Sequence, residues 1–448
     1  MTEEELLPLS ELDGLGVANT KKSSGKTSAT CKFEALHDRV EKRNFTLGVS
    51  NGVLYNLGTY FISRSTIIPS FLATITASSA LIGIVSQFES IGWYLPQLFA
   101  AAFVVHRSRK MPMYRLSVVL RGLAFFGMAA TAFFCRDHKL LLVVFILTYG
   151  LFTFSSGIGG VVFTELLAKA IPHRRRGRFL GLRLSFGALL SATLGATTIT
   201  LLLSAAPFPL NFAHIFLVGA VITTTGLVFM ALMREPRTDN LPEKRRMSGQ
   251  LKMGLTILQQ DKRFATFVTA RMLLGSWTIG VPFLILFAQS HLGFRTGDLG
   301  IFITAECVGL IISNFFWERI ADRRNTKLVL LITASLAIAL PLCLLAFQAF
   351  TLPPILFTVI FATSAAIDAG MTIGGLGYLI EIAPEDERAT YIGVHNSLLA
   401  LPSLLTALAG LLLDWAGFTT LYLVVLAIGV CALLAVRRLE YIRHTVVS

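Results

Sequence analysis

Long uninterrupted apolar segments dominate the pattern of this chain. From Leu184 to Met233 there is no Asp, Glu, Lys or Arg, and this run is broken only by the turn-forming segment 206–211. Residues 328–367 form a second uncharged run, interrupted by the proline pair at 353–354. A helix needs about 20 apolar residues to cross the roughly 30 Å hydrocarbon core of a bilayer. Each run therefore predicts two membrane-spanning helices joined by a tight turn.

The same pattern, followed along the chain, predicts an all-α membrane protein with twelve transmembrane helices. A soluble helical core would need polar faces at the helical period, and these runs have none. The twelve predicted spans are 45–68, 79–104, 116–134, 140–163, 179–203, 213–233, 264–289, 299–317, 328–350, 354–380, 390–413 and 417–436.

The composition agrees with a membrane protein and excludes other classes of protein. Of 448 residues, 54% are hydrophobic and 15% are charged, whereas a soluble domain has about 45–50% and 25%. Disordered, fibrous and ordinary soluble proteins are thereby excluded. The five cysteines form no C-x-x-C pair, so we expect no disulfide framework, no metal site and no cofactor.

The cations predict how the chain is oriented. Positively charged segments resist translocation and stay on the cytoplasmic side. If both termini are cytoplasmic, 31 of the 39 Lys and Arg lie on that side, and only Arg136, Lys139 and Arg295 lie on outer loops. We therefore expect a multi-pass protein of a plasma or bacterial inner membrane, with both termini cytoplasmic. This asymmetry explains the net charge of +13 without a nucleic-acid partner.

The chain also contains an internal repeat. Segment 57–60, Leu-Gly-Thr-Tyr, recurs as segment 274–277, Leu-Gly-Ser-Trp, and Glu89 recurs as Glu306 at the same offset. Further matches follow in the same order. Six helices per copy give parallel repeats related by an axis along the membrane normal. The fold class we predict is two pseudo-symmetric six-helix bundles with a central cavity.

The repeat sets the expected domain boundaries. Residues 1–43 are polar and lack the apolar stretch of a signal peptide, so we expect a flexible cytoplasmic tail. The predicted bundles are 44–233 and 264–436, joined by a basic cytoplasmic linker at 234–263. A short cytoplasmic tail, 437–448, follows.

Loop motifs identify a family resemblance. The segment 322–327 after the eighth helix, Asp-Arg-Arg-Asn-Thr-Lys, and Arg234-Glu235-Pro236-Arg237 after the sixth are similar to signatures of the major facilitator superfamily. The first-half loop, 105–110, keeps the basic end but has Val105 where the family has Asp. The chain resembles this family from about residue 45 onward.

The resemblance implies a cytoplasmic latch between the bundles. The signature Asp is thought to act through its charge and a neighbouring helix N-terminus, which attracts anions. Because Val105 cannot do this, we expect a one-sided latch that rests on Asp322. The predicted gating residues are Arg109, Lys110, Asp322, Arg323, Lys327 and Arg388.

Carboxyl groups inside the spans are candidates for proton coupling. A charge at the bilayer centre costs about 2.5–3.5 kcal/mol on insertion scales, so each charged residue within a span is expected to have a structural or functional role. Glu89 and Glu306 lie near the middle of equivalent helices, and Asp368 lies within the tenth. A desolvated carboxyl can hold and release a proton. The alternative is that the duplicated glutamates hydrogen-bond neighbouring helices at a packing point.

Other polar and aromatic residues of the spans are candidates for substrate binding. In this family helices 1, 4, 7 and 10 line the cavity, so a guanidinium on them could clamp an anion. The alternatives are snorkelling of Arg64 to the outer surface and ordinary packing of the aromatic side chains. The candidates are Asn56, Tyr60, Arg64, Tyr149, Arg271, Trp277 and Asp368.

These features together predict a secondary active transporter. It would move a small polar solute by alternating access, with proton coupling, and work as a monomer. A drug or metabolite exporter of the same family, or a non-transporting sensor or assembly protein on the same scaffold, are alternatives. No H-E-x-x-H, G-x-S-x-G or Walker sequence occurs, so we do not expect an enzyme or an ATP-driven pump.

Overall fold

The structure is a computed structural model that describes residues 28–104, 109–235, 254, 256–384 and 387–441. Within these ranges the regular structure is helical, and no strand occurs. The first half contains α2 (Ser28–Thr59), η2 (Tyr60–Ile62), α3 (Ile67–Ile75), α4 (Ser79–Ser86), α5 (Phe88–Val104), α6 (Met111–Phe134), α7 (His138–Ala170), α8 (His173–Leu190), the π-helical η3 (Ser191–Gly195), α9 (Ala196–Ala205) and α10 (Leu210–Ala231).

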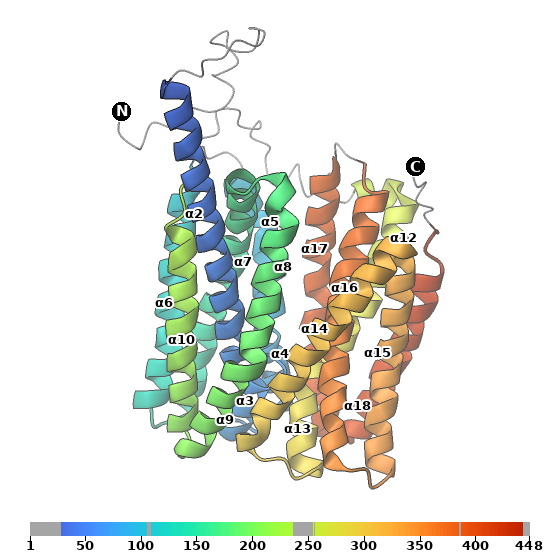
Figure 1. Cartoon of the computed structure of the whole chain (residues 1–448). Helices are drawn as coiled ribbons and strands as arrows, with labels where there is room; N and C mark the ends of the chain where they lie inside the picture. The colour runs from blue at the N-terminus through green and yellow to red at the C-terminus, as the bar shows by residue number, and fades with distance from the viewer. Residues whose placement is uncertain (1–27, 105–108, 236–253, 255, 385–386, 442–448) are drawn as a thin grey trace.

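The second half repeats this arrangement. It contains α12 (Lys262–Gly275), η4 (Ser276–Gly280), α13 (Val281–His291), η5 (Thr296–Asp298), α14 (Leu299–Arg323), α15 (Thr326–Ala349), η6 (Pro354–Phe357), α16 (Thr358–Ile382), α17 (Arg388–Leu404) and α18 (Thr406–Arg437). In Figure 1 the two halves lie side by side, the first coloured blue to green and the second yellow to red.

The helices agree with the predicted membrane architecture. Nine helical segments of the described chain are long and apolar enough to cross a membrane. One of them, Thr390–Arg437, contains the last two predicted spans, which are separated inside α18 at Gly417 (φ +77°). The first two predicted spans are present as α2–α3 and α4–α5. The all-α membrane fold is confirmed, and the arrangement is consistent with twelve spans.

The first helix begins earlier than the sequence pattern indicated. We expected a flexible tail over 1–43, but α2 already starts at Ser28. The segment 32–43 is rich in Lys, Glu and Arg, which are good helix formers that need no apolar environment. Residues 1–27, most of the predicted linker and the end of the predicted C-terminal tail lie outside the described residues.

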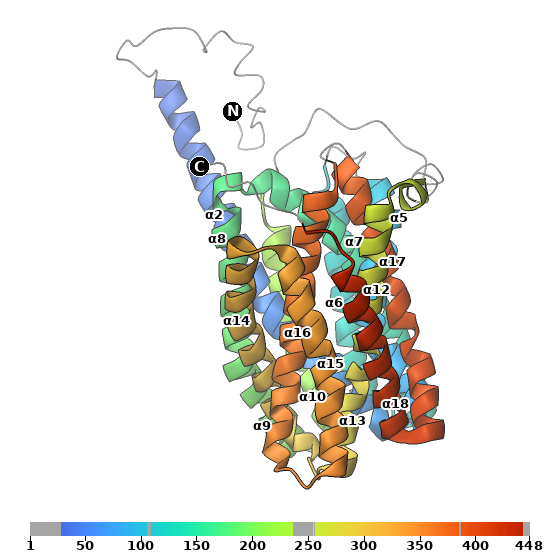
Figure 2. The same ribbon diagram turned by 90° about the vertical axis from the view of Figure 1, so that its right-hand side faces the viewer.

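The two ends of the bundle can be told apart by the chain termini. Figure 1 shows α2 beginning and the C-terminus lying at the same end, which we call the terminal side; the opposite end is the far side. Figure 2 shows α14, α15, α16 and α18 extending between these two sides. Large apolar side chains on the outer surface, such as Leu147, Leu201 and Phe315, are more than half exposed, as expected for lipid contact.

The two halves touch closely on the far side. A Cβ placed on Gly410 of α18 would lie 2.3 Å from the backbone oxygen of Ser79, at the start of α4. The backbone nitrogen of Ser79 in turn donates to Oδ2 of Asp414, at 3.1 Å. A third contact joins α14 to the fifth helix, where Oγ1 of Thr304 donates to the oxygen of Ala192 at 3.1 Å. These contacts close the far side between the halves.

The contact at Gly410 leads to a testable prediction. Gly410→Ala should weaken far-side closure by about 1–3 kcal/mol, because an added methyl group overpacks the contact with Ser79. The matched control is Gly393→Ala on α17, where an added Cβ has no atom within 4 Å. Spin labels on Thr74 and Ser290, both exposed, would report the far-side separation. We expect a longer-distance population in Gly410→Ala only; identical distributions in both variants would contradict the assignment.

Candidate functional site

A cavity of about 490 Å³ lies between the two halves. Elements from both halves contribute to it: the first helix and α5 on one side, and α12, α14, α16 and α17 on the other. Its charged and polar lining residues are Asn56, Thr59, Tyr60, Ser63, Arg64, Ser65, Glu89, Ser90, Tyr94, Arg271, Thr278, Glu306, Ser364, Asp368, Thr372 and Ser403.

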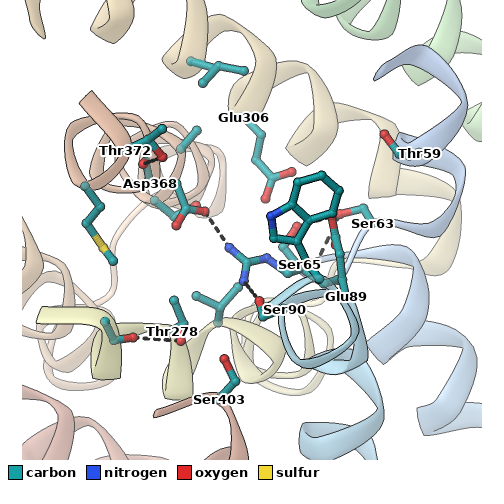
Figure 3. Close-up of a pocket in the computed structure, with 18 of the residues that line it drawn as sticks. Thr59, Ser63, Ser65, Glu89, Ser90, Thr278, Glu306, Asp368, Thr372 and Ser403 are labelled. Carbon is teal, nitrogen blue, oxygen red and sulfur yellow. Dashed lines mark hydrogen bonds and ion pairs between the residues drawn. The ribbon is translucent and has the colours of Figure 1, made fainter. Parts of the chain in front are cut away.

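An ion pair crosses this cavity. Nη2 of Arg64 lies 2.7 Å from Oδ2 of Asp368, and Nη1 of Arg64 donates to Oγ of Ser90 at 2.8 Å. Figure 3 shows the dashed line from the Asp368 carboxyl to the guanidinium and a second one from the guanidinium to Ser90. The Arg64 and Asp368 side chains are 19% and 42% exposed. The pair therefore joins the halves at a place that solvent can reach.

A break in the first helix places Arg64 in the cavity. Helix α2 ends at Thr59, and α3 starts only at Ile67. In the intervening segment the backbone nitrogen of Ser65 donates to Oγ of Ser63 at 3.3 Å, a local bond of the kind that competes with helix formation. Pro69 lies in the first turn of α3, where a missing N–H costs nothing.

The equivalent helix of the second half is broken in the same way. Segment 274–277, which repeats segment 57–60, leads into the 3₁₀ turn η4. Pro282 at the start of α13 has no N–H, so the oxygen of Thr278, four residues earlier, receives no helical bond from it. This oxygen accepts the backbone N–H of Val281 in the 3₁₀ turn, and Nε2 of Gln87 also donates to it, at 2.9 Å. Discontinuous helices at corresponding places of two repeats indicate a binding site.

Two further carboxyl groups face the cavity without a cation of their own. Glu306 is 8% exposed and lies next to Ser65 of the other half. Glu89 follows Gln87 at the start of α5 and is more exposed. Neither glutamate forms an ion pair with any residue that the structure describes. Figure 3 shows the Glu306 carboxyl pointing into the cavity toward the guanidinium that binds Asp368. These groups can therefore change protonation without breaking an ion pair.

The structure brings together most of the predicted binding residues. Asn56, Tyr60, Arg64, Arg271 and Asp368 all line the cavity. Asn56 is also held in place, because its Nδ2 donates to the backbone oxygen of Arg183 at 3.2 Å. Arg64 therefore faces the cavity and pairs there, which differs from the alternative of snorkelling to the surface.

Two predicted binding residues lie away from the cavity lining. Tyr149 is completely buried, with its ring stacked 6.2 Å from Phe88 and 5.8 Å from Phe145. Trp277 is buried as well, and its Nε1 donates to Sδ of Met371 at 3.0 Å. Both aromatic side chains pack between helices, which is the alternative that the sequence left open.

The sequence analysis missed several residues of the site. Ser90, Trp93 and Tyr94 line the cavity from α5. Trp93 lies four residues after Glu89, and Tyr94 lies four residues after Ser90, and residues four apart lie on the same face of a helix. A helical projection from Glu89 would have found them. No comparable signal distinguishes Ser403 of α17 from other small residues of that helix.

The predicted gating residues lie at helix ends on the terminal side. Lys110 is buried and forms an ion pair with Glu165 of its own half. Nζ of Lys327 donates to the backbone oxygens of Arg437 and Leu439, at 3.1 and 2.5 Å, also within one half. Arg109, Asp322 and Arg323 are exposed, and Arg388 begins α17. The latch role of Asp322 stays a prediction.

The segment after the sixth helix has a clear structural role. The Glu235 carboxylate accepts hydrogen bonds from the backbone nitrogens of Lys110 and Met111, at 2.8–2.9 Å, at the start of α6. Lys169 at the end of α7 pairs with the same carboxylate at 3.2 Å. An anion is favoured at a helix N-terminus. Glu235, which follows α10, therefore connects α10 to the start of α6 and the end of α7.

Sequence comparison finds a family match in the second half of the chain. A family model described as "Major Facilitator Superfamily" matches residues 265–446. This match covers the second half of the chain, from α12 to the C-terminal end. The matched region is the half whose loop carries Asp322, whereas the first-half loop has Val105 at the corresponding place. Residues 105–108 of that loop lie outside the described residues.

Solved transporters of the superfamily share the fold along most of the chain. The nucleoside transporter NupG superposes with a TM-score of 0.63 at 15% identity, covering 90% of this chain and 100% of NupG. A D-xylose-proton symporter superposes with a TM-score of 0.65 at 14% identity, covering 89% of this chain and 98% of the symporter. At these identities the likeness concerns the fold.

A curated relative matches part of the chain. An uncharacterised protein of Mycobacterium tuberculosis is 25% identical over 279 residues, which cover 59% of this chain and 52% of that protein. The chain thus spans about half the length of the curated relatives that it matches.

The ion pair across the cavity leads to a testable prediction. If Arg64 and Asp368 stabilise each other, Arg64→Gln and Asp368→Asn should be non-additive by about 0.5–3 kcal/mol in a double-mutant cycle. Thermal unfolding of the purified single and double variants would measure this. A cycle of Arg64→Gln with Glu318→Gln serves as control, since Glu318 is exposed on α14. Additive losses in both cycles would contradict a direct interaction.

Proposed function

We propose that the protein is a secondary active transporter that moves a small polar solute by alternating access. The observation that carries this proposal is the polar cavity between the repeats, bridged by the ion pair of Arg64 and Asp368. Because the two partners belong to different halves, a solute that competes for either charge changes the attraction between the halves. Such a differential interaction is what a ligand needs to shift a conformational equilibrium.

We propose that protons drive this transport through Glu306 and Glu89, with Asp368 as a third participant. Ionisable groups inside membrane proteins are rare and commonly form proton pathways. Glu306 lies next to Ser65, close to the ion pair, and has no cation of its own. Its deprotonation adds a negative charge beside Arg64 and so competes with Asp368 for that guanidinium. Protonation would thus alter the bridge between the halves.

We place the terminal side in the cytoplasm and the protein in a plasma or bacterial inner membrane. The asymmetry of Lys and Arg supports this orientation. In this orientation the far-side contacts of Gly410 and Asp414 join the halves at the outer face. One chain supplies the whole cavity lining, which supports a monomer as the working unit. An exporter would use the same cavity with the opposite direction of net flux.

Proton coupling can be tested in proteoliposomes. A panel of sugars, nucleosides, amino acids and organic acids is added outside, and a pH-sensitive dye reports proton entry. We expect at least one solute to carry protons inward with the wild type. Glu306→Gln should abolish solute-driven proton entry and uphill accumulation, while exchange of labelled for unlabelled solute continues, because exchange needs no net proton release.

The controls separate coupling from folding. Glu318→Gln removes an exposed carboxylate from the same helix as Glu306 and should behave as the wild type. The double variant Glu89→Gln with Glu306→Gln tests whether the second glutamate replaces the first. Proton entry that persists in the double variant would remove both glutamates as carriers. Absence of any exchange in the wild type, for all solutes, would contradict transport itself.

A further inference from the structure

Arg271 is a second guanidinium in the cavity, and its surroundings differ from those of Arg64. It lies on α12 and lines the cavity, although its side chain is only 5% exposed. Its Nε and Nη1 are buried and have no hydrogen-bond partner. No ion pair within the described residues includes Arg271. A buried cation without a partner is costly unless a ligand supplies the compensating charge.

Two other arginines of the spans have hydrogen-bond partners within the protein, although Nη2 of Arg121 is also buried without one. Nη1 of Arg183 donates to the oxygen of Gly48 and to Oδ1 of Asn51, at 2.9 and 3.1 Å. Nε of Arg121 donates to the oxygen of Ser117 at 3.3 Å, and this side chain lies outside the cavity lining. Arg271 thus combines burial, a position at the cavity and unused donors.

The chain makes specific room for this guanidinium. A Cβ on Gly375 of α16 would lie 2.6 Å from Nε and 2.9 Å from Cζ of Arg271. Any larger residue at position 375 would therefore displace the guanidinium. The carboxylate of Asp368 interacts electrostatically with Arg271, but its Oδ2 binds Arg64 at 2.7 Å. Asp368 is thus engaged elsewhere, and Arg271 remains available.

We infer that Arg271 binds the carboxylate of the transported solute, which is a small organic acid with a single negative charge. A guanidinium offers several N–H donors in a plane that matches a carboxylate. This inference rests on the proposed transport function and adds the substrate class. A single charge is favoured because Glu89, Glu306 and Asp368 line the same cavity and repel a second one. A cavity of about 490 Å³ accommodates a small solute.

Binding can be measured without knowing the natural solute. The purified protein is heated with acetate, lactate, pyruvate or benzoate, and separately with the corresponding uncharged carboxamides. Inorganic phosphate, a neutral sugar and a nucleoside complete the panel. A ligand of the folded state raises the melting temperature by mass action. We expect at least one carboxylate to stabilise the wild type and its carboxamide to have no effect.

Variants assign this binding to Arg271. Arg271→Gln should weaken carboxylate binding about 10-fold or more, since hydrogen bonds to charged groups are among the stronger ones. Arg271→Lys keeps the charge and should retain part of the affinity. Gly375→Ala removes no charge but should also weaken binding, because the added methyl group displaces the guanidinium. Gly393→Ala, with open space around its Cβ, is the matched control.

Two results would overturn the inference. One is stabilisation by a neutral sugar, a nucleoside or phosphate but by none of the carboxylates. The other is carboxylate binding that is equally strong in the wild type, Arg271→Gln and Gly375→Ala. Neither result touches the proposed transport function, which is judged separately by solute exchange in proteoliposomes. Loss of exchange for every solute would contradict the proposed transport function. Carboxylate binding at Arg271 would still be tested by the melting temperatures.

Discussion

The ion pair between Arg64 and Asp368 is the interaction on which the functional part of the structure depends. Charges are expensive in a membrane interior, and here two of them compensate each other across the boundary between the repeats, 2.7 Å apart. Arg64 belongs to the first half and Asp368 to the second. The pair therefore holds the halves together only while neither side chain binds another charged group. Glu306 and Glu89 line the same cavity and form no ion pair with any residue that the structure describes. In the mechanism that we propose, solute binding, protonation and movement of the halves all act on this one contact.

Helix breaks at equivalent places of the two repeats make this contact possible. Pro69 and Pro282 each lie in the first turn of the far-side part of a broken helix, where the chain loses one backbone N–H donor. In the first half the break carries Arg64 into the cavity. In the second half the oxygen of Thr278, in the 3₁₀ turn η4, also accepts a hydrogen bond from Nε2 of Gln87 of the opposite half, at 2.9 Å. Breaks at equivalent places thus accompany two contacts between the halves: the charged pair of Arg64 with Asp368, and the neutral hydrogen bond from Gln87 to Thr278.

Much of this could be predicted from the sequence, and the remainder could not for physical reasons. Apolar run length predicted the spans, and the repeat predicted where Glu89 and Glu306 would lie, since both signals are local or periodic. The pairing of Arg64 with Asp368, 304 residues apart, depends on how the halves dock and leaves no local signal. Tyr149 was predicted to bind substrate but packs against other aromatic side chains. The sequence does not show how the helix is rotated about its axis, and this rotation decides whether a side chain faces the cavity or a neighbouring helix.

The central claim is that one cavity opens alternately to the two sides, and a bridge across the far side tests it most directly. Ser70 and Gln289 belong to different halves, and Nε2 of Gln289 lies 3.4 Å from Oγ of Ser70. Cysteines at both positions, in a background without the five native ones, can be joined by a short reducible thiol-specific reagent. We predict that bridging stops solute exchange in proteoliposomes and that reduction restores it, while each single cysteine variant stays active. Exchange at an unchanged rate with the bridge in place would contradict alternating access.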